Sequence, residues 1–138
     1  MTSTVRLPSG TLDESKLPIL MIVYPADPTP EMLDVLFENY RRIARENDRF
    51  AYLIDMRFLD LSFAGAAVRR HAAELHARYR HELARSSVCE ARVVGSPLMR
   101  GVLVAFDWIK GEGLWPCETF ASREEAVAWI EGKLSAKP

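Results

Sequence analysis

The stretch "AYLIDMRFLDLS", residues 51–62, runs from apolar residues into alternating charged and apolar ones. With Phe50 in front, its first half is a nearly unbroken apolar run, which is typical of a strand covered on both faces. A similar run, "LPILMIVY" (residues 17–24), is followed by a helical pattern that begins with Thr29 as a cap and Pro30 at the first helical position. The order strand, helix, strand predicts a right-handed crossover between two parallel strands.

Strands and helices alternate along the rest of the chain. A long helix is predicted from residue 64 to about 85, and a third covered strand, "VCEARVVG", at residues 88–95. Ser96 and Pro97 then open another helix, a short strand "CETF" follows at 117–120, and Ser122 begins the last helix. We expect these residues of the helix after Ser96 to face inward: Leu98, Val102, Ala105 and Ile109.

This alternation predicts an α/β fold: a single-domain sandwich over residues 1–138, with a mixed, mostly parallel sheet of about five strands and helices packed on it. At its N-terminal end we expect a hairpin, in which "TVRLP" (4–8) pairs with "LPILMIVY" (17–24) and the polar "SGTLDESK" connects them. A chain of 138 residues is long enough for a full core without disulfides or metal.

The composition is that of an ordinary globular protein. Eighteen basic and nineteen acidic side chains leave a net charge of −1, which argues against nucleic-acid binding through phosphate neutralisation. No apolar run reaches the length of a membrane-spanning helix, and the N-terminus lacks the pattern of a signal peptide. Cys89 and Cys117, which fit neither a disulfide framework nor a metal motif, are expected as reduced thiols in the core. We therefore expect a cytoplasmic protein without an integral membrane segment.

Three phrases, "AYLIDMR", "SPLMRGVLVAFDWI" and "TFASREEAVAWI", resemble the STAS-like proteins, and more closely an uncharacterised bacterial branch called SpoIIAA-like or STAS/SEC14-like. The resemblance covers about residues 17 to 134. It implies a small α/β domain that acts by binding, either to partner proteins in bacterial signalling or, in the SEC14-like branch, to a small apolar ligand. It also implies that Ser62, within "DLSFAG", corresponds to the phosphorylated serine of the anti-sigma-factor antagonists, where Leu61 and Phe63 depart from their motif.

Candidate ligand-binding residues follow the predicted parallel strands. Asp55 lies at the carboxyl end of a strand, the edge where α/β folds usually bind ligands, and Arg57 beside it is a further candidate. The alternative is that Asp55 only pairs with Arg57 or caps a turn. Ser96 and Arg100, at the start of the next helix, form a candidate anion site, because a helix N-terminus offers unpaired N–H groups. If the two strands are neighbours, Asp55 and Arg100 open onto one edge and can form a salt bridge instead.

The long helix between residues 64 and 85 is rich in arginine and contains all three histidines. His71, His76 and His81 are five residues apart, so they do not share one face, and we expect them on a solvated surface rather than at a metal. Arg69 and Arg70 belong to a local excess of positive charge that is a candidate docking face for a partner protein.

Trp108 and Trp115 flank a glycine-containing loop, where large aromatic residues line a pocket or close the end of a core. No common nucleotide, hydrolase or zinc motif occurs, so we do not expect an enzyme or a cofactor. The leading hypothesis is a non-enzymatic regulatory module that acts through protein contacts, including contacts with a second copy of itself. The alternative is a carrier of a small apolar or lipid ligand. An enzyme that uses Asp55 and Arg100 is the weakest of the three hypotheses.

Overall fold

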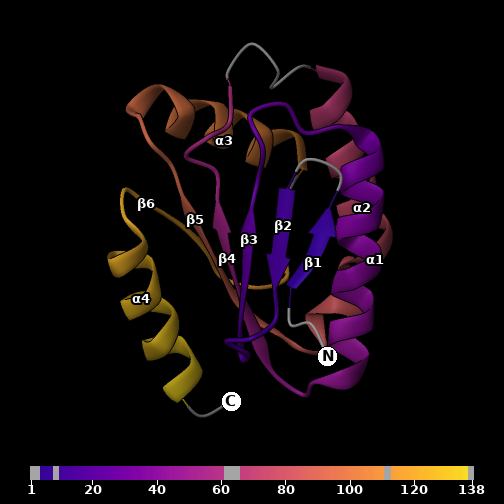
Figure 1. Cartoon of the computed structure of the whole chain (residues 1–138), viewed down its shortest axis with the longest axis vertical. Helices are drawn as coiled ribbons and strands as arrows, with labels where there is room; N and C mark the ends of the chain where they lie inside the picture. The colour runs from indigo at the N-terminus through magenta and orange to yellow at the C-terminus, as the bar shows by residue number, and fades with distance from the viewer. Residues whose placement is uncertain (1–3, 8–9, 61–65, 111–112, 137–138) are drawn as a thin grey trace.

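The computed structural model describes residues 4–7, 10–60, 66–110 and 113–136, and these form one sheet with four helices (Figure 1). The sheet has six strands, and their order in space is their order along the chain. The elements are β1 (Thr4–Leu7), β2 (Gly10–Asp13), β3 (Ile19–Val23), α1 (Pro30–Glu46), β4 (Phe50–Asp55), α2 (Ala66–Ala84), β5 (Ser87–Val93), α3 (Pro97–Lys110), β6 (Cys117–Phe120) and α4 (Arg123–Ser135).

The sheet is mixed and mostly parallel, which confirms the predicted α/β class. Strands β3 to β6 run parallel, with Met21 opposite Leu53, and Leu53 opposite Ala91. Strands β1 and β2 form an antiparallel hairpin, and β2 also pairs antiparallel with β3. The predicted pairing of residues 4–8 with 17–24 was wrong, because β2 lies between them. Only Leu12 of β2 is buried, so this short strand lacks the apolar run by which β3, β4 and β5 can be recognised.

The two faces of the sheet are covered by different helices. Helix α4 packs on one face, where its Ala126 and Ile130 join the small side chains of β4 and β5, while α1 and α2 lie on the opposite side (Figure 1). Because side chains alternate along a strand, each charged residue of the sheet belongs to one of these two layers. Asp55 follows Leu53 on the α4 face, whereas Glu90 and Arg92 share the opposite face with Tyr52 and Ile54.

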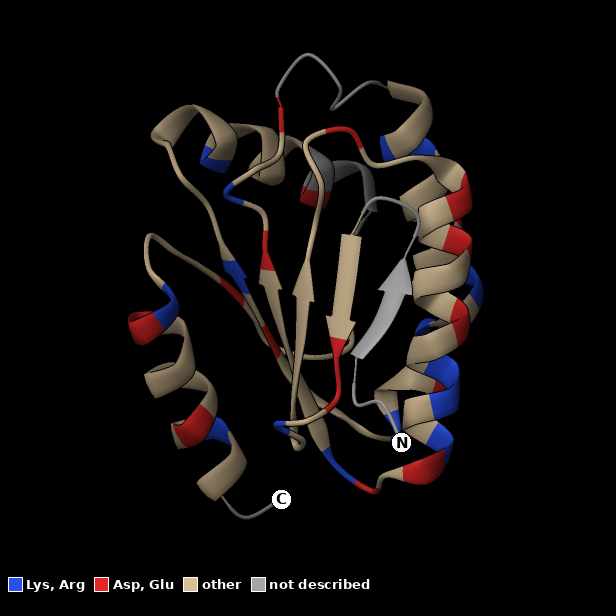
Figure 2. Cartoon of the chain, in the orientation of Figure 1, with Lys and Arg blue, Asp and Glu red and all other residues tan. Residues whose placement is uncertain are grey.

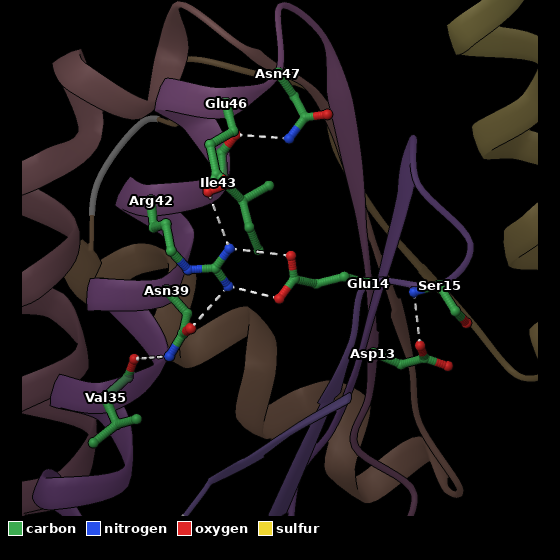
Figure 3. Close-up of polar contacts among 9 residues, drawn as sticks. All are labelled: Asp13, Glu14, Ser15, Val35, Asn39, Arg42, Ile43, Glu46 and Asn47. Carbon is green, nitrogen blue, oxygen red and sulfur yellow. Dashed lines mark hydrogen bonds and ion pairs between the residues drawn. The ribbon is translucent and has the colours of Figure 1, made fainter. Parts of the chain in front are cut away.

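Helix α1 begins as the sequence predicts, because the Thr29 hydroxyl accepts a hydrogen bond from the Met32 N–H and Pro30 stands at the first position. Charged residues of both signs are frequent along α1 and α2 (Figure 2). One of them, Arg42 of α1, holds Glu14 in the connection between β2 and β3 with an Nη2–Oε2 distance of 2.6 Å (Figure 3). This ion pair connects helix α1 to the segment between β2 and β3, at the antiparallel side of the sheet.

Helix α3 turns a different face inward from the one that the sequence indicated. Met99 and Leu103 are buried against Val94, whereas Leu98 is 67% exposed and Ala105 is exposed. Apolar residues occur all round this helix, so their spacing does not determine which side meets the sheet. The expectation for Leu98 and Ala105 was therefore wrong.

Gly10 starts β2 at a point where a side chain has no room. A Cβ atom there would lie 2.8 Å from the Val23 carbonyl oxygen of the neighbouring strand. We expect Gly10→Ala to lower the free energy of unfolding by about 1–2 kcal/mol, because backbone must shift to relieve the contact. Gly132→Ala is the control: its Cβ would meet nothing within 4 Å in exposed α4, and we expect a gain of about 0.4–1 kcal/mol. Urea unfolding of both variants measures the difference, and equal effects would contradict this explanation.

Candidate functional site

The sheet face beneath α1, α2 and α3 contains a cavity of about 120 Å³. Apolar side chains make up most of its wall: Leu33 and Phe37 of α1, Val68 and Ala72 of α2, Val102 and Leu103 of α3, with Pro28, Ile54, Met56 and Leu59. The polar part of the wall consists of Tyr24, Tyr40, Arg69, His76, Glu90 and Arg92. The cavity therefore combines a mainly apolar lining with a few hydrogen-bonding groups, the usual character of a small-molecule site.

Arg92 is a buried cation in the cavity wall, only 2% exposed. Its Nε lies 3.0 Å from Glu90 Oε2, and its terminal nitrogens lie 2.9 and 3.1 Å from the two carboxylate oxygens of Asp107 in α3. Burial alone lowers the pKa of Arg92, but the carboxylates of Glu90 and Asp107 raise it above its ordinary value, so the guanidinium stays charged. The Trp115 indole N–H also donates to Glu90 Oε1, at 3.3 Å.

Tyr40 and Tyr52 pack in this layer, and their hydroxyl groups differ in what they bind. The Tyr52 hydroxyl is 2.6 Å from Ser87 Oγ. Tyr40 is 5% exposed, and among the described residues its hydroxyl has no hydrogen-bond partner. Burial raises the pKa of Tyr40, and so do nearby Tyr24 and Glu90, which keeps its phenol neutral. Tyr40 lines the cavity, and its hydroxyl is a buried, neutral group.

His76 extends the buried face of α2. It is 6% exposed, and its ring meets the Trp115 ring edge-on at 5.6 Å between centroids. The expectation that His76 lies on a solvated surface was wrong. His76 directly follows Leu75, and both residues belong to the buried side of α2. His71 instead reaches α1, with Nε2 2.7 Å from Asp34 Oδ1, and His81 is exposed.

Asp55 lies on the other face of the sheet from the cavity. It is fully buried, and its carboxylate accepts hydrogen bonds from Arg57 Nε (3.0 Å), Arg57 Nη2 (2.8 Å) and Arg123 Nε (3.1 Å). Burial raises the pKa of Asp55, but the hydrogen bonds from Arg57 and Arg123 lower it by more than burial raises it. The pKa is therefore below its ordinary value. Arg123, the first residue of α4, is a partner that sequence reasoning missed.

Ser96 and Arg100, the predicted anion site, both lie at the start of α3. Ser96 caps α3, since its Oγ accepts from the Met99 N–H at 3.1 Å. Arg100 is exposed, and within the described ranges no ion pair joins it to Asp55, which is bound by Arg57 and Arg123 instead. The structure therefore brings Asp55 together with Arg57 but not with Arg100.

The other predicted site residues are spread over the molecule. Arg69 lines the cavity and is partly exposed, and Arg70 is exposed, so the docking face stays a prediction. Trp115 packs on Tyr52, with ring centroids 5.8 Å apart, behind the cavity wall. Ser62 and the side chain of Trp108 lie outside the described residues. Cys89 is buried as predicted, but Cys117 is exposed, because the short strand β6 forms the edge of the sheet.

Sequence reasoning missed four of the six polar residues of the cavity wall: Tyr24, Tyr40, Glu90 and Arg92. A signal for two of them was present in "VCEARVV", where an acidic and a basic residue stand two apart in a strand that is otherwise apolar. Such a pair shares one face of the strand, and a charge in a covered layer needs a partner.

Comparison with protein-family models, with curated proteins and with solved structures finds no match to this chain. Across the described part of the chain, no helix is both long and apolar enough to cross a membrane. Those residues also contain no group of three or more His, Cys, Asp or Glu side chains placed to hold a metal ion. The resemblance to STAS-like proteins stays a prediction.

Proposed function

We propose that this protein binds a small, mostly apolar molecule in the cavity beneath α1, α2 and α3. The observation that carries the proposal is the cavity itself, about 120 Å³ in a layer where protein interiors are otherwise close-packed. Three helices supply its apolar wall, and the cavity is partly open to solvent, so a ligand can enter it. A bound apolar molecule removes part of this wall from water, which is favourable.

The size of the cavity limits the ligand. An engineered apolar cavity of about 150 Å³ in another protein takes up benzene. A cavity of about 120 Å³ therefore suits a molecule of roughly one aromatic ring, and not a lipid with a full acyl chain unless the helices separate. This favours the small-ligand hypothesis over the lipid form of the carrier hypothesis.

The proposal is one of binding without catalysis. The cavity's carboxylate, Glu90, accepts from Arg92 and from Trp115, so its oxygens are already engaged. Regulation through protein contacts stays a prediction of the sequence, since Ser62 lies outside the described residues and Arg69 belongs to the cavity wall. Ligand binding and protein contact are compatible, because the occupied cavity and the exposed surface of α2 are different parts of the molecule.

Filling the cavity is expected to abolish binding of a small apolar probe. Ala72→Phe adds a ring to a position in the cavity wall, and we expect it to weaken the binding of toluene by about tenfold or more, which corresponds to about 1.4 kcal/mol or more. Chemical-shift titration of the 15N-labelled protein with toluene measures the affinity. The wild-type protein should show saturable shifts that include Phe37, Val68 and Leu103.

Ala67→Phe is the matched control, because Ala67 lies on the same helix but is exposed. It should bind toluene like the wild-type protein. Circular dichroism checks that both variants fold. Absence of saturable shifts in the wild-type protein, or unchanged binding in folded Ala72→Phe, would refute the proposed function.

A further inference from the structure

Tyr40 lines the cavity, and its hydroxyl is buried and, among the described residues, without a hydrogen-bond partner. Leaving such a group unsatisfied destabilises the fold, because its desolvation is not compensated. Its ring is held between Phe37 and Tyr52, with centroids 5.3 and 4.9 Å away, in edge-on contacts. The ring is therefore held at a fixed place, and a partner for its hydroxyl has to come to it.

We propose that the ligand is a neutral, single-ring molecule with a hydroxyl group, of the phenol class, and that this hydroxyl pairs with Tyr40. The inference rests on the proposed function and adds the chemistry of the ligand to it. A hydroxyl group both donates and accepts, so it can pair with the phenol of Tyr40 in either direction. The ring of the ligand then lies against Leu33, Phe37 and Val68.

The ion pair of Glu90 and Arg92 in the wall favours a neutral ligand over an ion. Arg92 is already bound by two carboxylates, those of Glu90 and Asp107. An anionic ligand would be repelled by Glu90, and Arg92 is already paired and so offers it little compensation. A cationic ligand would be repelled by Arg92. Burying an ion without a partner costs far more than burying a hydrogen-bonded hydroxyl. A phenol, with a pKa of about 10, remains neutral at pH 7.

The test compares phenol with toluene, which carries a methyl group in place of the hydroxyl. One neutral hydrogen bond contributes about 0.5–1.5 kcal/mol, so Tyr40→Phe should weaken the binding of phenol by about two- to twelvefold. The same variant should leave the affinity for toluene within about twofold, since the ring remains. Isothermal titration or chemical-shift titration measures both dissociation constants.

Tyr52→Phe is the control, because the Tyr52 hydroxyl binds Ser87 and lies outside the cavity wall. It should leave both affinities unchanged. Equal loss of phenol and toluene in Tyr40→Phe, or loss of phenol in Tyr24→Phe alone, would overturn the assignment to Tyr40. Tighter binding of benzoate than of phenol would overturn the neutral class. If toluene and phenol both fail to bind the wild-type protein, the proposed function itself is refuted.

Discussion

Arg92→Met is expected to lower the free energy of unfolding by about 3–5 kcal/mol, the range measured when one partner of a buried ion pair is removed. Arg92 is 2% exposed, and the side chain of its partner Glu90 is 12% exposed. Methionine fills much of the same space but leaves the carboxylate of Glu90 buried beside an apolar side chain. Urea unfolding followed by circular dichroism measures the loss.

A double variant separates two effects of Arg92→Met: the unpaired buried carboxylate of Glu90 and the lost packing of the arginine side chain. Glu90→Gln in the Arg92→Met background removes that charge but keeps an oxygen that can accept from Trp115. We expect the double variant to recover much of the lost stability. Asp107→Asn alone should cost far less, since the Asp107 side chain is 44% exposed and reaches water. A stable Arg92→Met protein, or a double variant no better than the single one, would contradict this role of the pair.

Local signals in the sequence were sufficient for most elements of the fold. The apolar run at 50–55 coincides with β4, and Thr29 with Pro30 marks the start of α1. Ser122 caps α4 as predicted, with its Oγ accepting from the Glu125 N–H. Each of these signals lies within a few neighbouring residues, so no knowledge of tertiary contacts is needed to recognise it.

The failures occurred where distant parts of the chain decide the outcome. Strand β2 is held by its pairing with β1 and β3, and its own sequence is mostly polar. The inward face of α3 is chosen by contact with Val94 and Met56, because apolar residues surround the helix. The cavity is a further case, since unfilled space between three helices and a sheet has no local pattern in the sequence.

The sheet places its two buried charged clusters on opposite faces, with different relations to the helices. Arg92 binds Glu90 within its own strand and Asp107 from α3, beside the cavity. Asp55 binds Arg57 just after its strand and Arg123 from α4. In both clusters a charged residue of the sheet pairs with a residue of a helix. The clusters therefore hold α3 and α4 against the sheet, and they also neutralise buried charges.

Asp55→Asn is expected to lower the free energy of unfolding by about 2–3 kcal/mol at pH 7. The carboxylate is fully buried and bound by two arginines, and asparagine can accept from them only as a neutral amide. The loss falls below that of Arg92→Met, because the side chains of Arg57 and Arg123 are each 40% exposed and can turn to water. Asp48→Asn, at an exposed aspartate, is the matched control and should have little effect.

Acid titration distinguishes the charge of Asp55 from its shape. The folded-state pKa lies below the ordinary value of 3.8, so the ionised carboxylate stabilises the fold above that pH. This contribution is lost as the pH falls from about 3.8 through the lowered pKa, because the folded protein must then take up a proton on a group that binds two cations. The stability difference between wild type and Asp55→Asn should therefore shrink between pH 5 and about pH 2, whereas the difference for Asp48→Asn should change much less. A difference for Asp55→Asn that stays constant over this range would mean that its packing, and not its pairing with Arg57 and Arg123, holds α4 to the sheet.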